Sequence, residues 1–297
     1  PVFENAEAEF YIAKKDGVTV GRIAAMVNWV EIEEQKKNKL RFGWYDTIDD
    51  LEVSKKLLES VIEFGKKRKL EFVDGPVGFS NMDKAGLLIE GYEELNTMIT
   101  WYHYPYQKEH LKKLGFSKLA EWVEYKIKIF SAEDAPEKVK KFSKIIQQRY
   151  ELKVLNFKSR KEIIPYVDKM FELLNVTYSN LQTYVTIKQY QIDFYKEKFI
   201  KYIHPDFIKC CLDKDDNLIA FLITMPSFSR ALKKINGKMG LMGYLRLFKA
   251  QHFNDRVSLY LIGVDPKYQS KGVTAVIFNE LQNTFNKRGI VEVETNP

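Results

Sequence analysis

The sequence predicts a mixed α/β fold that is built twice in tandem, each copy around a mixed β-sheet. The first observation is an internal repeat: FGKKRKLEFVDGP (64–76) and FNKRGIVEVETNP (285–297) share one order of helix end, basic turn, apolar strand and proline. The second is that a helix with an apolar face precedes each segment, and a strand precedes each helix, RFGWY (41–45) or VSLYLIGV (257–264). The third is an earlier hairpin in each copy.

The two hairpins are identified by their turns. EFYIAKKDGVTVGRIAAM is predicted to turn at Asp16-Gly17, and FIKCCLDKDDNLIAFLITM around Asp215-Asp216-Asn217. The repeated unit is therefore strand, strand, insertion, strand, loop, helix, strand.

The insertion is about 21 residues longer in the second copy, and the excess falls in 226–252. Leu241, Leu245 and Phe248 in this segment share one helical face, and Arg246 and Lys249 lie beside them. We expect an ordinary connection packed on the sheet. The alternatives are a cover over an acyl group or a contact with a lipid-like substrate or a membrane.

The repeat divides the chain into a first domain, 1–130, and a second domain, 131–297, with 131–150 as the connection. The second copy has about 60 residues before its hairpin, whereas the first has about 15. Conversely, the first copy continues for about 54 residues after Pro76, including the predicted strand WVEYKIKI (122–129). The sequence is therefore expected to be cut at both ends, with the C-terminal part of the second domain missing.

Composition narrows the possible partners and the compartment. The net charge is +7, but the lysines are spread and no compact basic tract alternates with aromatics, so no clear nucleic-acid face is predicted. No uncharged apolar run is long enough for a membrane span, and the first residues do not resemble a signal peptide. Cys210 and Cys211 are adjacent, which predicts reduced strand residues and favours a cytoplasmic protein without a cysteine metal site.

The segment GVDPKYQSKGVTA (263–275) is predicted to join a strand to a helix through a loop with free backbone amides. Such amides and the helix dipole attract anions, typically a phosphate. Gly272 permits positive φ and a close backbone approach, and Lys267 and Lys271 add positive charge.

This loop resembles the cofactor loop of the GCN5-related N-acetyltransferases (GNAT), whose pattern is V-x-P-x-[YF]-[QR]-x-x-G-[ILV]-[GA]. The matching residues are Val264, Pro266, Tyr268, Gln269, Gly272 and Val273. Thr274 stands where the family has Gly or Ala. HLKKLGF (110–116) is similar to a second family segment near the domain end, so the chain looks like a tandem GNAT protein.

The resemblance implies an acyltransferase that moves an acetyl or other acyl group from acetyl-CoA or another acyl-CoA to an amine of a small molecule or peptide. The strand at 259–264 would bind the pantetheine arm through its backbone, the amides of 269–274 would hold the pyrophosphate, and the strand at 290–295 would splay away. The implied cofactor-binding residues are Ile262, Val264, Gln269, Ser270, Lys271, Gly272, Val273 and Thr274.

Candidate catalytic residues lie on the two strands beside this slot. Glu292 and Glu294 alternate with valines and so share one face of a strand, where a carboxylate can take a proton through water. Tyr260 is an alternative proton donor. No P-loop, metal-ligand spacing or Ser-His-Asp order accompanies them.

The first copy departs from the family pattern. Its equivalent loop, WYDTIDDLEVS (44–54), places Asp46, Asp49 and Asp50 where a pyrophosphate would lie, and like charges repel. Leu111 stands where many family members have the tyrosine that protonates the leaving thiolate. We therefore expect a degenerate domain that keeps the fold without the cofactor, its acids capping a helix start.

Two other readings stay open. Fem-type aminoacyl transferases also pair two such domains and take aminoacyl-tRNA, which the net positive charge favours and the intact diphosphate loop does not. A non-catalytic module that binds acyl-CoA or a partner is favoured by the missing tyrosine and the degenerate first copy.

Overall fold

The computed structural model describes residues 2–131, 133–134, 136–199 and 203–296. Backbone contacts divide the chain into two compact units. Unit 1 consists of Pro1–Glu121 and Leu181–Thr186, and unit 2 of Trp122–Asn180 and Ile187–Pro297. The predicted domains 1–130 and 131–297 were defined by the sequence repeat, and that division remains a prediction. The two units are defined by backbone contacts.

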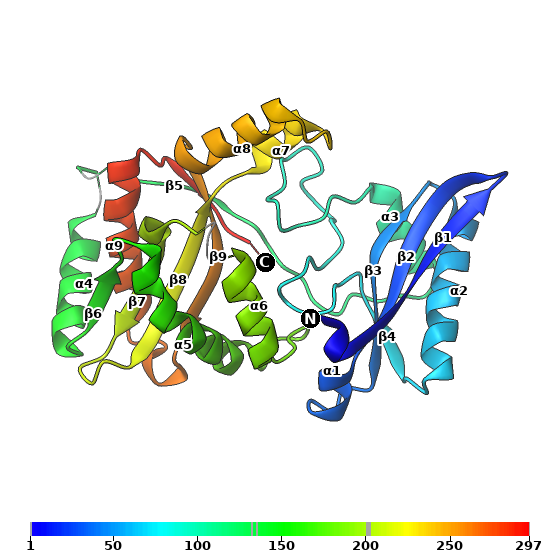
Figure 1. Cartoon of the computed structure of the whole chain (residues 1–297), viewed down its shortest axis with the longest axis horizontal. Coiled ribbons are helices and arrows are strands. Elements are labelled where there is room, and N and C mark those ends of the chain that lie inside the picture. The colour runs from blue at the N-terminus through cyan, green and yellow to red at the C-terminus, as the bar shows by residue number, and fades with distance from the viewer. Residues whose placement is uncertain (1, 132, 135, 200–202, 297) are drawn as a thin grey trace. The chain divides into compact units, whose positions relative to one another are not determined.

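Unit 1 is built on a four-stranded sheet in the order β1-β2-β3-β4 (Figure 1). The strands are β1 (Ala6–Lys15), β2 (Val18–Asn28), β3 (Lys39–Thr47) and β4 (Phe72–Asp74). The pairs β1–β2 and β2–β3 are antiparallel, and β4 is parallel to β3. Asp16 and Gly17 have φ angles of 50° and 79°, so the hairpin turn that the Asp-Gly pair predicts is confirmed.

Unit 1 also contains helical elements. They are the 3-10 turn η1 (Val2–Glu4), α1 (Trp29–Glu33), α2 (Leu51–Lys67) and α3 (Pro105–Lys113). α2 presents Leu57, Val61 and Phe64 at helical spacing, and these residues pack on Ile23 and Phe42 of the sheet. The core of unit 1 therefore lies between α2 and the sheet.

The segment 181–186 comes from the second half of the sequence but belongs to unit 1. Its Tyr184 and Val185 are buried. The Thr183 carbonyl accepts a hydrogen bond from the buried Arg41 guanidinium at 2.8 Å, and the Val185 amide donates to Asn81 Oδ1 at 3.2 Å. The chain thus returns to complete unit 1 after unit 2 has begun.

Unit 2 is built on a six-stranded sheet in the order β5-β10-β9-β8-β7-β6. The strands are β5 (Lys126–Lys128), β6 (Lys153–Asn156), β7 (Ile208–Leu212), β8 (Leu218–Pro226), β9 (Arg256–Val264) and β10 (Glu292–Glu294). All neighbours are antiparallel except β9 and β10. β5 lies in the segment predicted as a strand of the first domain, and it pairs with β10 at the edge of this second sheet.

Helices pack on both faces of the second sheet (Figure 1). The helical elements of unit 2 are α4 (Glu137–Arg149), α5 (Arg160–Tyr178), α6 (Gln189–Phe199), the 3-10 turn η3 (Pro205–Phe207), α7 (Ser229–Ile235), α8 (Leu241–His252), the 3-10 turn η4 (Pro266–Tyr268) and α9 (Val273–Arg288). α4 and α9 share a core with Ala220 and Leu222 of β8, whereas α5 packs on the opposite face. Within the described ranges, no helix combines the length and apolarity that crossing a membrane requires.

The predicted duplication is confirmed by the order of elements. β1, β2, β3, α2 and β4 of unit 1 correspond to β7, β8, β9, α9 and β10 of unit 2. Cys210 and Cys211 lie in β7 as unpaired, buried residues, and burial raises the pKa of each thiol to about 12. Both are therefore strand residues, as predicted, and poor nucleophiles at neutral pH.

Candidate functional site

The parallel strands β9 and β10 pair over a short stretch. β10 pairs only with residues 256–258 of β9, so residues 259–264 have a strand partner on the β8 side alone among the described residues. The splaying of the strand at 290–295 stays a prediction, because the Asn296 side chain still donates to the Leu259 carbonyl. An unpaired strand edge exposes backbone N–H and C=O groups that another extended molecule can bind.

Alternate residues of β9 direct their backbone N–H and C=O groups towards the open edge. Asp265 donates its backbone N–H to Ile219 at 2.8 Å on the β8 side, so Val264 and Ile262 direct their polar groups to the open side. The carbonyl oxygens there are already engaged: Tyr178 Oη donates to Ile262 at 2.9 Å, and the Gln269 side chain donates to Val264 at 3.1 Å. The N–H groups of Ile262 and Val264 are left facing the same edge.

A β-bulge interrupts β9 at Tyr260. Leu261 pairs with Ile223 and Leu259 with Thr224, which leaves Tyr260 as the extra residue. The Tyr260 hydroxyl is buried and has no hydrogen-bond partner among the described residues, and burial raises its pKa to about 12. A buried polar group without a partner is costly, so it marks a place where a ligand group can bind.

The loop after β9 ends in an uncapped helix start. The backbone amides of Ser270, Gly272, Val273 and Thr274 have no acceptor in the described part of the chain. Gly272 is the N-cap residue of α9 with φ 81°, and the first turn of α9 contains no acidic residue. Several free N–H groups at the positive end of a helix form an anion-binding site.

The two lysines of this loop differ in their surroundings. The Lys271 ammonium lies 5.2 Å from the ring centre of Tyr268 and 5.7 Å from that of Tyr150, a cation–π arrangement. Lys267 is exposed, and its backbone amide donates to Asp265 Oδ1 at 2.7 Å. Lys271 is therefore held over two aromatic rings, a contact that the sequence did not predict.

The carboxylates of β10 converge on one guanidinium. Arg256 Nη1 lies 2.8 Å from Glu292 Oε1 and 3.9 Å from Glu294 Oε1, so the two carboxylates share one face, as their alternation predicts. The buried Glu294 also accepts hydrogen bonds from the hydroxyls of Ser227 at 2.8 Å and Ser258 at 3.2 Å. Arg256 and these serines carry no motif, which is why sequence reasoning missed them.

Unit 1 has the same type of pair at the equivalent place. Lys39 Nζ lies 2.8 Å from Asp74 Oδ2 and 2.9 Å from Glu31 Oε1, and all three side chains are buried. Lys39 and Asp74 begin and end the paired stretch of β3 and β4, as Arg256 and Glu294 do for β9 and β10. A cation and a carboxylate therefore join the two parallel strands across their paired stretch in both units.

The edge of β3 in unit 1 is used by the chain itself. The Val77 amide donates to the Phe42 carbonyl at 2.8 Å, and Tyr106 Oη donates to the Thr47 carbonyl at 2.6 Å. A Cβ on Gly43 would lie 2.3 Å from the Val77 carbonyl oxygen. The groups that would bind an extended ligand in unit 1 are thus already paired or covered.

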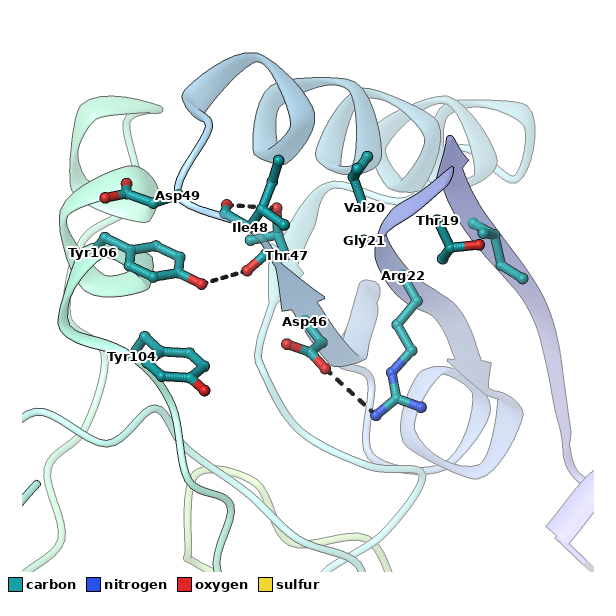
Figure 2. A pocket seen from close by; sticks show the side chains of 11 residues that line it. Thr19, Val20, Gly21, Arg22, Asp46, Thr47, Ile48, Asp49, Tyr104 and Tyr106 are labelled. Carbon is teal, nitrogen blue, oxygen red and sulfur yellow. Dashed lines mark hydrogen bonds and ion pairs between the residues drawn. The ribbon is translucent and has the colours of Figure 1, made fainter. Parts of the chain in front are cut away.

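Acidic side chains occupy the helix start of unit 1, as predicted. Asp50 is the N-cap of α2 and accepts from the Glu52 amide at 3.0 Å. A pocket of about 550 Å³ lies beside it. Asp46, Asp49 and Tyr106 are among the residues that line this pocket (Figure 2). Leu111, at the position where the family has its tyrosine, is buried in the core.

Sequence comparisons place two curated proteins near this chain. No protein-family model matches it. It is 24% identical over 294 residues to Protein YghO of Escherichia coli (strain K12), an alignment that covers 96% of this chain and 73% of that protein. It is 21% identical over 279 residues to the bacterial ceramide synthase of Caulobacter vibrioides (strain NA1000 / CB15N), covering 91% and 70%.

Among solved structures, the chain is similar to a GCN5-related glucosamine N-acetyltransferase region of a fungal multi-domain GH3 β-N-acetylglucosaminidase. The TM-score is 0.50 at 11% identity, over 97% of this chain and 30% of that chain. The chain thus spans about a third of the length of that protein. The likeness extends over nearly the whole chain and shows its fold: a GNAT fold with two mixed sheets, as the sequence predicts.

Proposed function

We propose that the chain is an acyltransferase that takes its acyl group from an acyl-CoA bound to unit 2. The observation that carries the proposal is a continuous path of backbone donors. The open edge of β9 presents the N–H groups of Ile262 and Val264 and leads directly into the uncapped start of α9. A ligand with amide groups at one end and a diphosphate at the other fits this order of donors.

The residues that we assign to the acyl-CoA are those that the sequence indicated. Ile262 and Val264 are assigned to the pantetheine amides. The diphosphate is assigned to the loop residues Gln269, Ser270, Lys271, Gly272, Val273 and Thr274, of which four have free amides. The absence of an acidic side chain from the first turn of α9 supports this assignment, because a carboxylate there would repel the diphosphate.

The chemistry is attack of an uncharged amine on the thioester carbonyl, in which a C–N bond forms and the C–S bond breaks. The amine loses a proton, and the departing thiolate gains one. We assign the thiolate proton to the Tyr260 hydroxyl, because this hydroxyl on β9 is buried, has no hydrogen-bond partner among the described residues and carries its proton at neutral pH. The amine proton is assigned to Glu292 or Glu294, with Arg256 holding both carboxylates in place.

For the acceptor we propose a long-chain amine. This rests on the relative that is a bacterial ceramide synthase, since ceramides are N-acyl derivatives of long-chain amino alcohols. We assign no acyl-CoA to unit 1, because Asp50 caps the start of its helix α2 and the chain itself covers the edge of β3.

The test is calorimetric titration of acetyl-CoA and of a long-chain acyl-CoA into the protein and two variants. Gly272→Asp places a carboxylate at the start of α9. Gly289→Asp is the matched control, because Gly289 also has positive φ, at the other end of α9, and a Cβ there would meet no described atom within 4 Å. We expect micromolar binding that Gly272→Asp weakens at least about 100-fold and Gly289→Asp preserves.

Failure of the intact protein to bind either thioester would contradict the proposal. Release of free thiol is then followed with a long-chain amine, a small polar amine and no amine. Release with the long-chain amine alone supports the proposed acceptor, whereas release with the small amine alone contradicts it. Binding without release for any amine would favour a non-catalytic module, and consumption of aminoacyl-tRNA in place of the thioester would favour the Fem-type reading.

A further inference from the structure

The hairpin of helices α7 and α8, residues 226–254, is an addition to the fold. It connects β8 to β9, whereas the corresponding strands of unit 1 are joined through the short helix α1. The sheet and its core therefore form without it in one of the two copies. A segment that the fold does not require is free to serve binding.

The charge of this hairpin has one sign. Its sequence contains no Asp or Glu and six basic residues: Arg230, Lys233, Lys234, Lys238, Arg246 and Lys249. Among the described residues, only Arg230 of these has an ion pair, with Asp255 at 3.2 Å. The other five charges are available to an anionic surface.

The apolar side chains of α8 point outward. The structure describes every residue of α8, and Gly243 is the one that is buried. On the opposite face lie Leu241, Leu245 and Phe248, which are 78%, 53% and 57% exposed. Met242 and Tyr244 lie at the sides of this face and are 61% and 65% exposed. Met239 and Phe253 extend this face at either end, with exposures of 49% and 74%. A helix that buries its glycine and exposes its large apolar residues is suited to contact another apolar surface, such as the interior of a membrane.

Basic residues border this apolar face. Lys249 follows Phe248, and Lys238 precedes Met239. Arg246 Nη1 donates to the Lys234 carbonyl at 2.6 Å, which fastens α8 to α7. Large apolar side chains flanked by lysine and arginine are typical of helices that lie in the interface of an anionic membrane.

We propose that the α7–α8 hairpin docks the protein on an anionic lipid bilayer, with the exposed face of α8 inserted among the headgroups. A second copy of the chain is a poorer occupant, because a two-fold contact through this face would bring two sets of six positive charges together. An anionic bilayer matches both the charge and the apolar side chains.

The hairpin begins and ends beside the candidate site. The Ser227 amide donates to the Arg256 carbonyl at 3.0 Å, and the Asn254 side chain also donates to Ser227. Ser227 in turn holds Glu294. Docking would therefore place the membrane surface next to the end of β9 where Glu294 lies. The docking itself does not depend on the proposed reaction.

The experiment is co-sedimentation of the protein with phosphatidylcholine vesicles, with and without phosphatidylglycerol. We expect binding to the anionic vesicles that falls with added salt. Leu245→Ser with Phe248→Ser should lower the partition coefficient at least about tenfold. Lys238→Gln with Lys249→Gln should lower it about thirtyfold on anionic vesicles only. The control Ile145→Ser with Val176→Ser removes two residues of similar exposure (58% and 56%) from α4 and α5, and should change nothing.

Circular dichroism establishes that each variant is folded before it is compared. The proposal is overturned if the intact protein does not bind anionic vesicles, if it binds neutral ones equally well, or if the control pair loses as much binding as the hairpin pairs. Sedimentation velocity supplies a further outcome: a dimer that Leu245→Ser with Phe248→Ser dissociates, together with no vesicle binding, would assign the face to a second copy.

Discussion

Phe142 of α4 packs against Gly272 at the start of α9, so closely that a Cβ on Gly272 would lie 3.0 Å from two of its ring carbons. Gly272 also has φ 81°, which side chains disfavour. Steric contact and backbone conformation therefore exclude a side chain independently. α4 packs on the loop that precedes α9, although the sequence indicated it only as a connection.

The first prediction separates these two reasons. Gly272→Ala should lower the free energy of unfolding by about 1–2 kcal/mol for the strained φ, and further because of Phe142. Gly289→Ala, with φ 68° and open space, should show the strain alone. Adding Phe142→Ala to Gly272→Ala should restore part of the difference in urea unfolding. Equal losses at the two glycines would show that Phe142 does not matter.

The second prediction concerns Tyr260. Tyr260→Phe removes a buried hydroxyl without a partner, so stability should stay the same or rise by up to about 1 kcal/mol. Acyl transfer should fall about 100-fold if this hydroxyl protonates the thiolate. Because the pKa is raised to about 12, the hydroxyl form should persist and kcat should remain level to about pH 10. Full activity of the variant would remove Tyr260 from the mechanism.

The third prediction uses the equivalent pairs of the two units. Glu294→Gln and Asp74→Asn each weaken a buried contact between parallel strands, and each should cost about 1–3 kcal/mol of stability in urea unfolding. Only Glu294→Gln should lower acyl transfer, because Asp74 lies in the unit without an assigned donor. If both variants lose activity in step with stability, Glu294 has a structural role alone.

The fourth prediction is a pH dependence of unit 1. Burial lowers the pKa of His103 from 6.5 to about 4, so the folded protein resists a proton that the unfolded chain accepts. The contribution of neutral His103 to the free energy of unfolding should be complete above about pH 6.5. It should be lost progressively towards pH 4, by up to about 3 kcal/mol.

The measurement is urea unfolding between pH 4.5 and 7.5, followed by tryptophan fluorescence, which reports mainly on unit 1 because Trp29, Trp44 and Trp101 lie there. His103→Asn should flatten the profile, since an amide oxygen can replace the nitrogen that accepts from the Leu88 amide at 3.3 Å. An unchanged profile in the variant would assign the dependence to other groups.

Local patterns made much of the fold predictable. The Asp-Gly turn, the apolar face of α2 and the strand–loop–helix order around Gly272 depend on neighbours in the sequence. Long-range pairings left no such signal. The pairing of β5 with β10 was not predictable, because a strand of alternating residues does not specify its partner.

The candidate site divides in the same way. The free amides around Gly272 were predictable, because a glycine-containing loop before a helix produces them by itself. The bulge at Tyr260 and the hydrogen bond from Tyr178 to Ile262 arise from the register of β8 with β9 and from the packing of α5. Neither leaves a mark on the local sequence.

The crossing of the chain between its units has a consequence for synthesis on the ribosome. Unit 1 lacks the Thr183 carbonyl that holds Arg41 until residues 181–186 have emerged, long after its sheet is made. β5 remains unpaired for longer still, because its partner β10 follows about 160 residues later. Synthesis of that stretch takes roughly ten to thirty seconds at ordinary rates of translation. During that interval the nascent chain carries an unpaired strand, so a chaperone that binds short extended segments has its longest opportunity at residues 126–128.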